Sequence, residues 1–202
     1  MAPKYGTTLR DALNDAYETA IGTAPILELR TGNPPATPAT ADSGTLLMTL
    51  TLPSDWMAAS SGGVKAKTGT WSGTGAAAAG AGTIAAHYRL KNSAGSVVHD
   101  QGAVVVTGGI AATCSITSGN TSITAPANSI PNQANVSGTG IPVGTIVVSG
   151  GGTTTLVLSL APTATNASAA LTFSGDLELD NPSIAQNQAL SISTWSRTAP
   201  NA

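Results

Sequence analysis

Apolar and polar residues alternate along the first half of residues 83–107, where every second position is apolar: Ile84, Ala86, Tyr88 and Leu90. A period of two is typical of a β-strand that buries one face. Residues 92–96 are polar and contain Gly95, which predicts a hairpin turn into a second strand. Because a lone hairpin is only marginally stable in water, we expect other segments to cover its apolar face.

Further short strands are predicted before and after this hairpin, over residues 25–31, 45–52, 64–71 and 189–195. The pattern is clearest in residues 45–52, where leucine and methionine alternate with threonine. Leu47 interrupts the polar face of that strand, which indicates that this face is covered as well. The chain is therefore predicted to be an all-β protein.

One helix is predicted near the N-terminus. Its apolar residues recur at helical spacing in a single stripe: Leu9, Leu13, Tyr17 and Ile21, with Ala12, Ala16 and Ala20 beside them. We expect Thr8 to cap the helix, Asp11 to lie in its first turn, and Gly22 to end it. The stripe would pack either on the domain's own sheet or on a neighbouring subunit, and the sequence leaves both open.

An uncharged block divides the chain. Residues 110–174 contain no charged residue, whereas Asp176, Glu178 and Asp180 follow at once. Short β-prone runs recur within the block about every ten residues, which favours a small β-sandwich or open barrel. We therefore expect a discontinuous first domain, residues 1–109 plus 175–202, and an inserted second domain, residues 110–174, because insertions are tolerated at exposed hairpin tips.

Composition excludes several functions. Charged residues make up 9% of the chain, and its 8 Lys and Arg form no cluster, so a nucleic-acid partner is not expected. No run approaches the ~18 apolar residues that span a bilayer, so no membrane partner is expected either. The single cysteine, Cys114, rules out an internal disulfide and is predicted to be a small buried residue.

Two segments have the composition of loops. Residues 32–44 contain three prolines, which predicts a long exposed loop, and residues 72–82 are rich in glycine and alanine, which predicts flexibility. We expect both segments to need a partner before they become ordered. Together with the scarcity of charge, this predicts self-association as a homodimer or homotrimer on a larger lattice.

No catalytic, cofactor-binding or metal-binding residues are expected. Asp176, Glu178 and Asp180 fall on one face of a strand about 7 Å apart, which spreads their oxygens, so a solvated face is expected rather than a calcium site. His87 and His99 would face each other across the hairpin, but no nucleophile accompanies them. The chain is therefore not expected to be an enzyme.

Several segments resemble a family of small virion structural proteins of tailed bacteriophages: TAIG at 19–22, LELRTGNPP at 27–35, ADSGTLL at 41–47, LPSDWM at 52–57 and GGVKAK at 62–67. Family members run from the equivalent of Gly109 directly into that of Asp176, so residues 110–174 depart from the pattern. That block is itself similar to a module of phage tail and surface proteins, through VSGTGIPVGT at 136–145 and TNASAALTF at 165–173.

The resemblance implies a capsid cement or decoration protein, with a jelly-roll-like β-sandwich bound to the outside of the capsid and the inserted domain facing outward. Its partners would be the major capsid protein and further copies of itself, and it would be made in the host cytoplasm. One alternative is a tail or fibre component whose inserted domain binds a host-surface glycan. Another is a polysaccharide-active enzyme, which would need paired carboxylates in a cleft.

The expected interface residues are Trp56, Met57, Pro34, Pro35 and Tyr17. Trp56 follows a predicted strand and lies in a turn, where a surface anchor is more expected than a core residue. Trp71 and Trp195 end predicted strands and are expected in the core. The contact with the capsid is therefore predicted to centre on Trp56.

Overall fold

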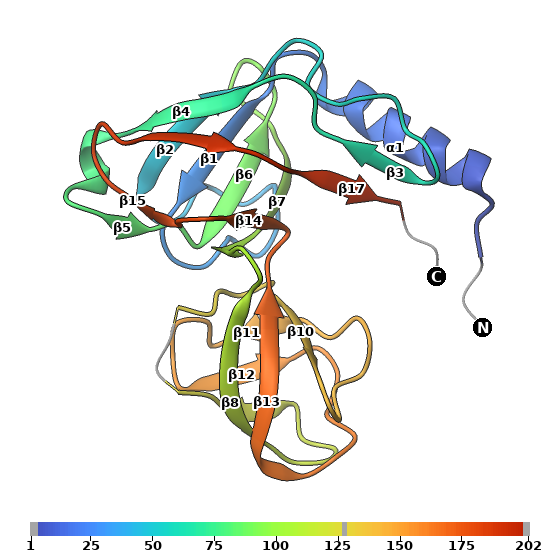
Figure 1. Ribbon diagram of the computed structural model, residues 1–202, viewed down its shortest axis with the longest axis vertical. Helices are drawn as coiled ribbons and strands as arrows, with labels where there is room; N and C mark the ends of the chain where they lie inside the picture. Colours follow the sequence, from blue (N-terminus) through green and yellow to red (C-terminus); the bar gives the residue numbers. More distant parts are fainter. Residues whose placement is uncertain (1–3, 127–128, 200–202) are drawn as a thin grey trace.

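The chain forms a mostly β structure with one N-terminal helix (Figure 1). The computed structural model describes residues 4–126 and 129–199. We call residues 4–109 and 175–199 the barrel body, because their main sheet of seven strands is nearly closed, and residues 110–174 the inserted body. The outermost residues of the expected first domain, and residues 127–128 of the second, lie outside the described residues.

The main sheet of the barrel body is mixed. Its strands, in spatial order, are β14 (Leu177–Leu179), β7 (Val98–Val106), β6 (His87–Lys91), β1 (Ile26–Arg30), β2 (Leu46–Thr51), β4 (Trp71–Gly75) and β16 (Ala189–Ile192). Only the pair of β14 with β7 is parallel. The strands are therefore hydrogen-bonded into one curled sheet, and the predicted hairpin is present as β6 and β7.

Two small sheets complete the barrel body. In one, β5 (Thr83–Ile84) pairs with β15 (Ser183–Ile184), and in the other β3 (Val64–Ala66) pairs with β17 (Ser196–Thr198). The segment predicted to be flexible, residues 72–82, is ordered within the chain itself: it contains most of β4 and a 3₁₀ turn, η1 (Ala77–Ala79), that contacts β2. Leu47 is fully buried, as its place in the pattern predicted.

The core of the barrel body is built around tryptophans. Trp56, Trp71 and Trp195 lie within 5.0–6.0 Å of one another between ring centroids. Trp56 is 0% exposed, and its Nε1 donates a hydrogen bond of 3.0 Å to the carbonyl of Gly22, where the helix ends. The prediction of Trp56 as a surface anchor is therefore wrong: its turn lies at the surface, but its side chain points inward.

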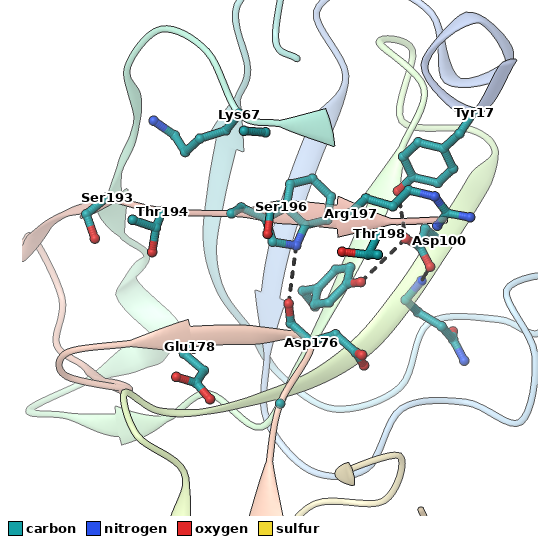
Figure 2. Close-up of a pocket in the computed structure, with 15 residues that line it drawn as sticks. Tyr17, Lys67, Asp100, Asp176, Glu178, Ser193, Thr194, Ser196, Arg197 and Thr198 are labelled. Atoms are coloured by element: carbon teal, nitrogen blue, oxygen red, sulfur yellow. Dashed lines mark hydrogen bonds between the residues drawn. The ribbon is translucent and has the colours of Figure 1, made fainter. Parts of the chain in front are cut away.

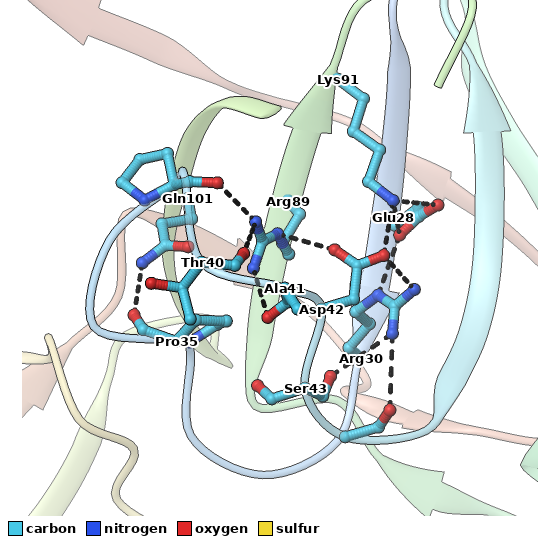
Figure 3. Close-up of polar contacts among 12 residues, drawn as sticks. Glu28, Arg30, Pro35, Thr40, Ala41, Asp42, Ser43, Arg89, Lys91 and Gln101 are labelled. Carbon is cyan, nitrogen blue, oxygen red and sulfur yellow. Dashed lines mark hydrogen bonds and ion pairs between the residues drawn. The ribbon is translucent and has the colours of Figure 1, made fainter. Parts of the chain in front are cut away.

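The proline-rich loop is held on the barrel by buried charges (Figure 3). Arg89, 1% exposed, donates to the carbonyls of Pro38 and Thr40 at 2.7 and 2.8 Å and pairs with Asp42 at 3.0 Å. Asp42 also pairs with Lys91 and Arg30, at 2.7 and 2.9 Å. The expectation that residues 32–44 need a partner to become ordered is therefore wrong, because the charged face of β6 orders them.

Strand β6 is consequently buried on both faces and not on one. Its polar residues His87, Arg89 and Lys91 lie beneath the loop, while Tyr88 and Leu90 face the aromatic core. The His87 Nδ1 is 2.9 Å from the carbonyl of Gly32 at the start of the loop. The alternation along this strand correctly predicted its two faces, but it did not predict that both are covered.

The inserted body contains a six-stranded antiparallel sheet. Its strands, in spatial order, are β10 (Asn135–Gly138), β13 (Asn166–Ser174), β8 (Ile110–Ile116), β9 (Ser122–Thr124), β12 (Thr155–Leu158) and β11 (Val147–Ser149). Ile110 and Phe173 are partners across β8 and β13, so the chain enters and leaves this body side by side (Figure 1). Cys114 is buried here, as predicted. Whether each body folds alone stays a prediction.

Candidate functional site

Helix α1 (Thr7–Ile21) packs on the barrel body through polar side chains. Asn14 is 0% exposed, and its Nδ2 donates to the Oγ of Ser60 at 3.1 Å and to the carbonyl of Gly63 at 3.0 Å. The carboxylate of Asp11 accepts from the N–H of Gly63 at 2.7 Å and from the Ser60 hydroxyl at 2.8 Å. These hydrogen bonds offset part of the cost of burial, while the Oδ1 of Asn14 is buried without a partner.

A buried lysine extends this polar contact. Lys65 of β3 is 2% exposed and pairs with Asp15 at 2.7 Å and with Glu18 at 2.9 Å. Burial disfavours the charge of Lys65, but the hydrogen bonds to both carboxylates outweigh burial and raise its pKa. The same hydrogen bond lowers the pKa of Asp15. The helix is thus held by charge-assisted contacts on the face that is polar in sequence.

The predicted apolar stripe of α1 consequently faces outward. Leu9 is 49% exposed and Leu13 is 43% exposed, and the three alanines beside them are exposed as well. Only Ile21, at the end of the stripe, is buried, and Tyr17 is half-buried. The helix begins after Gly6, so Thr8 is not its cap, whereas Gly22 ends it as predicted. We call the surface formed by Leu9, Ala12, Leu13, Ala16 and Ala20 the helix stripe.

A cleft opens where the barrel sheet fails to close. β14 and β16 end the strand order, and within the described residues each pairs with one strand only. A cleft of about 740 Å³ separates the start of β14 from residues 193–198, and a groove of about 160 Å³ continues between β14 and β16. We call the two together the seam. Figure 2 shows Ser193, Thr194 and Ser196 along one wall and Asp176 and Glu178 along the other.

Acidic and aromatic residues line the wide part of the seam. Asp100 accepts hydrogen bonds from Tyr17 at 2.7 Å and Tyr88 at 3.4 Å. The indole of Trp195 donates across the cleft to the backbone carbonyl of Asp176 at 3.2 Å. The guanidinium of Arg197 lies 4.0 Å from the centre of the Tyr17 ring.

Burial and the charge of Asp100 raise the pKa values of three residues in the seam. Burial raises the pKa of Asp176, and the nearby charge of Asp100 raises it further, against the hydrogen bond from the Ala103 N–H. Burial and the Asp100 charge also raise the pKa values of Tyr17 and Tyr88, so both stay protonated donors. A positive group between Asp100 and Asp176 would relieve the repulsion between the two carboxylates.

The expected interface residues do not form one surface. Met57, Pro34 and Pro35 are buried, as Trp56 is, so none of the four side chains is exposed to a partner in this structure. Tyr17, the fifth, lies in the seam.

Two of the other candidate residues, His87 and His99, are also placed differently from the sequence prediction. His87 lies opposite Ala103 in the β6–β7 ladder and so does not face His99. Asp176, Glu178 and Asp180 accept hydrogen bonds from the Ala103 N–H, the Gly108 N–H and the Thr107 hydroxyl, respectively. They therefore fasten β14 to β7 and its following turn, while Asp176 and Asp180 stay exposed and Glu178 is partly exposed, in agreement with the prediction of a solvated face.

Sequence reasoning missed the seam and the polar side of α1. The residues of the seam come from α1, β3, β6, β7, β14 and the C-terminal segment, and no local motif links them. For the helix, a usable signal was present, because Asn14, Asp11 and Asp15 lie on one helical face.

Comparisons of the chain with known protein families, with curated proteins and with solved structures find no match. Within residues 4–126 and 129–199, no three or more His, Cys, Asp or Glu side chains are grouped so that they could hold a metal ion. In the same residues, no helix has the length and hydropathy needed to cross a membrane. The function must therefore be argued from the surfaces described above.

Proposed function

We propose that the protein is a bacteriophage virion structural protein, a capsid cement or decoration protein that binds the outer capsid and stabilises contacts between major capsid proteins. The observation that carries the proposal is the helix stripe. A helix that buries its polar face and exposes its leucines leaves apolar surface in water, which is a cost unless a partner covers it. The stripe carries no charged side chain, so a partner would cover it without stranding an ion.

The arrangement of the two bodies supports the same proposal. Helix α1 lies along one side of the barrel body, and the inserted body extends from the end of the barrel body away from α1 (Figure 1). A protein attached through α1 would therefore carry the inserted body away from the attachment surface. The proposal includes the finer fold assignment: we assign the curled sheet to the jelly-roll-like β-sandwiches, with its facing walls as the two layers.

Self-association is part of the proposal, as a homodimer or homotrimer on the capsid lattice. Two of its original grounds are lost, because residues 32–44 and 72–82 are ordered within the chain. The helix stripe now supports it instead, since the stripe would be shared between a neighbouring copy and the capsid. Sedimentation of the isolated chain, alone and mixed with capsids, separates these two contacts.

The test is a particle-binding assay with the double variant Leu9→Gln/Leu13→Gln. Each leucine is about half exposed, so burying the rest contributes about 1 kcal/mol, and the pair contributes about 2 kcal/mol, or roughly 30-fold in affinity. Val97→Gln is the matched control, because Val97 is 48% exposed in the β6–β7 turn. Capsids lacking this protein are mixed with each variant, and the bound fraction is measured by cosedimentation.

The outcome decides between specific alternatives. Loss of binding in the double variant but not in the control, with unchanged thermal unfolding, supports attachment through the stripe. Gold-labelled antibody against the chain then places it on the head or on the tail of intact particles. Label on the tail would contradict the cement function and favour a tail or fibre role. If the double variant binds as well as the wild type, the helix stripe is not the attachment surface.

A further inference from the structure

The chain passes between the two bodies twice, and the two passages lie side by side. It enters the inserted body through Gly108 and Gly109 and leaves it through Gly175, and Ile110 and Phe173, just inside the inserted body, are partners across β8 and β13. Gly108 and Gly109 have φ values of 85° and 79°, which glycine adopts without strain. Two neighbouring passages form a line about which one body can turn against the other, so a contact outside the passages is needed to fix their orientation.

Other contacts between the bodies lie beside the passages. Asn135 of β10 pairs with Ser174, and its side chain is hydrogen-bonded to Asp176. Ala103 of β7 is fully buried in the core of the inserted body. An apolar cavity of about 320 Å³ is lined by residues of both bodies, and Ile84 on its wall is 46% exposed. Apolar packing therefore leaves part of the junction open.

Asn33 of the barrel body contacts two loops of the inserted body, residues 130–134 before β10 and residues 150–153 after β11. Its Nδ2 donates to the carbonyl of Gly151 at 3.2 Å, and its Oδ1 accepts from the N–H of Asn132 at 2.9 Å. The Gly151 N–H donates to the Oδ1 of Asn132 at 2.8 Å, so the two loops are also joined to each other. A Cβ on Gly151 would overlap the Oδ1 of Asn33, so this close approach requires glycine. The contact involves neither passage and can resist turning about them.

The proline-rich loop, residues 32–44, fixes the position of Asn33. The carbonyl of Asn33 accepts from the Ser43 hydroxyl at 2.9 Å, which closes the loop on itself. Asp42, the neighbour of Ser43, pairs with the buried Arg89 at 3.0 Å (Figure 3). The hold on the inserted body therefore depends on an ion pair that anchors the loop to the barrel body.

We propose that the proline-rich loop is a strap that sets the orientation of the inserted body, with Asp42 as its anchor on the barrel body and Asn33 as its hold on the inserted body. Loss of either side chain leaves both bodies folded but lets the inserted body turn about the passages. This inference goes beyond the proposed function and does not depend on it.

The test measures residual dipolar couplings of backbone amides in the full-length protein, which report how each body is oriented in a weakly aligned sample. In the wild type we expect a single alignment tensor to fit the residues of both bodies. In Asn33→Ala, the inserted body should need a different tensor of smaller magnitude. The couplings within each body should still fit that body's own structure, which distinguishes a change of orientation from a loss of fold.

Further variants separate the hydrogen bonds of Asn33 from its volume. Asn33→Asp has nearly the same size but places an oxygen against the Gly151 carbonyl, so it should separate the two tensors as Asn33→Ala does. In Asn33→Ala the Asn132 amide loses its acceptor and should exchange with solvent roughly tenfold faster. Asp42→Asn removes the anchor and should also separate the tensors.

Thr37→Ala is the matched control within the same loop. Its exposed hydroxyl is hydrogen-bonded to the hydroxyl of Thr40 at 3.0 Å, so the variant should keep a single tensor. The proposal is overturned by a single tensor in Asn33→Ala, by two tensors in the wild type, or by separate tensors in Thr37→Ala. A single tensor in Asp42→Asn would refute the role of Asp42 as the anchor.

Discussion

Replacing Trp56 by alanine is expected to unfold the barrel body at much lower temperature, and not to weaken a surface contact. The side chain is fully buried and contacts the rings of Tyr17, Trp71 and Trp195, at centroid distances of 5.9–6.1 Å. Its indole also donates to the carbonyl of Gly22, which closes the end of α1. The substitution therefore opens a cavity at the junction of helix and sheet.

The magnitude follows from these contacts. Truncating a buried aromatic residue to alanine costs about 3–5 kcal/mol in the free energy of unfolding, through lost transfer energy and the cavity that remains. Trp56→Phe keeps most of the ring but loses the hydrogen bond to Gly22, and is expected to cost about 1–2 kcal/mol. Since a domain of this size is stable by about 5–15 kcal/mol, the alanine variant loses a large share of the total.

Tryptophan fluorescence during urea unfolding is the assay. All three tryptophans lie in the barrel body and none in the inserted body, so the signal reports the barrel body alone. Trp71 and Trp195 remain as reporters in the variant. Thermal unfolding should shift down by about 6–20 °C, from about 3–5 kcal/mol at about 2–4 °C per kcal/mol for this chain length. Val97→Ala, at a half-exposed turn, is the control and should change stability by less than about 0.5 kcal/mol.

A different result would contradict the reasoning. If the free energy of unfolding of Trp56→Ala lies within about 1 kcal/mol of that of the wild type, the ring of Trp56 does not stabilise the core as its burial indicates. If the alanine variant is stable and binds particles poorly, Trp56 acts at a surface after all. If Trp56→Phe is as damaging as alanine, the hydrogen bond to Gly22 matters more than the packing.

Three further predictions concern the loop, the pH dependence and the inserted body. Asp42→Asn should cost about 3 kcal/mol, because buried Arg89 loses its carboxylate partner, whereas Arg30 and Lys91 keep Glu28. The substitution should also speed proteolytic cleavage within residues 32–44, and unchanged cleavage would contradict the loop's dependence on Asp42. Burial lowers the pKa of His87, and the charges of Arg30 and Arg89 lower it further, so the unfolded chain takes up a proton that the folded chain resists. The contribution of neutral His87 to the free energy of unfolding should therefore be fully present above about pH 6.5 and should decrease as the pH falls below that value. His87→Gln should reduce this dependence of stability on pH, and an equal dependence in the variant would assign it to other groups. Deleting residues 110–174 should leave a soluble barrel body with one cooperative transition in fluorescence, and an aggregated product would show that the two bodies fold together.

Local signals determined much of this protein. Alternation predicted the β6–β7 hairpin and strand β2, and Gly22 was correctly read as the end of α1, because each of these patterns depends on neighbouring residues. The absence of charge between residues 110 and 174 coincides with the bounds of the second sheet, β8 to β13, since a change in composition needs no long-range contact to be seen.

Tertiary structure decided which faces these elements bury. Periodicity shows which residues of α1 share a face, but the partners that stabilise its polar face, Ser60 to Lys65, lie about fifty residues away. Trp56 points inward because the end of the helix and the sheet meet around it, which no window of sequence contains. The seam likewise exists only because β14 and β16, far apart in the strand order, curl toward each other without pairing. Local patterns set the elements, and complementary contacts between distant segments selected the surfaces left to bind a partner.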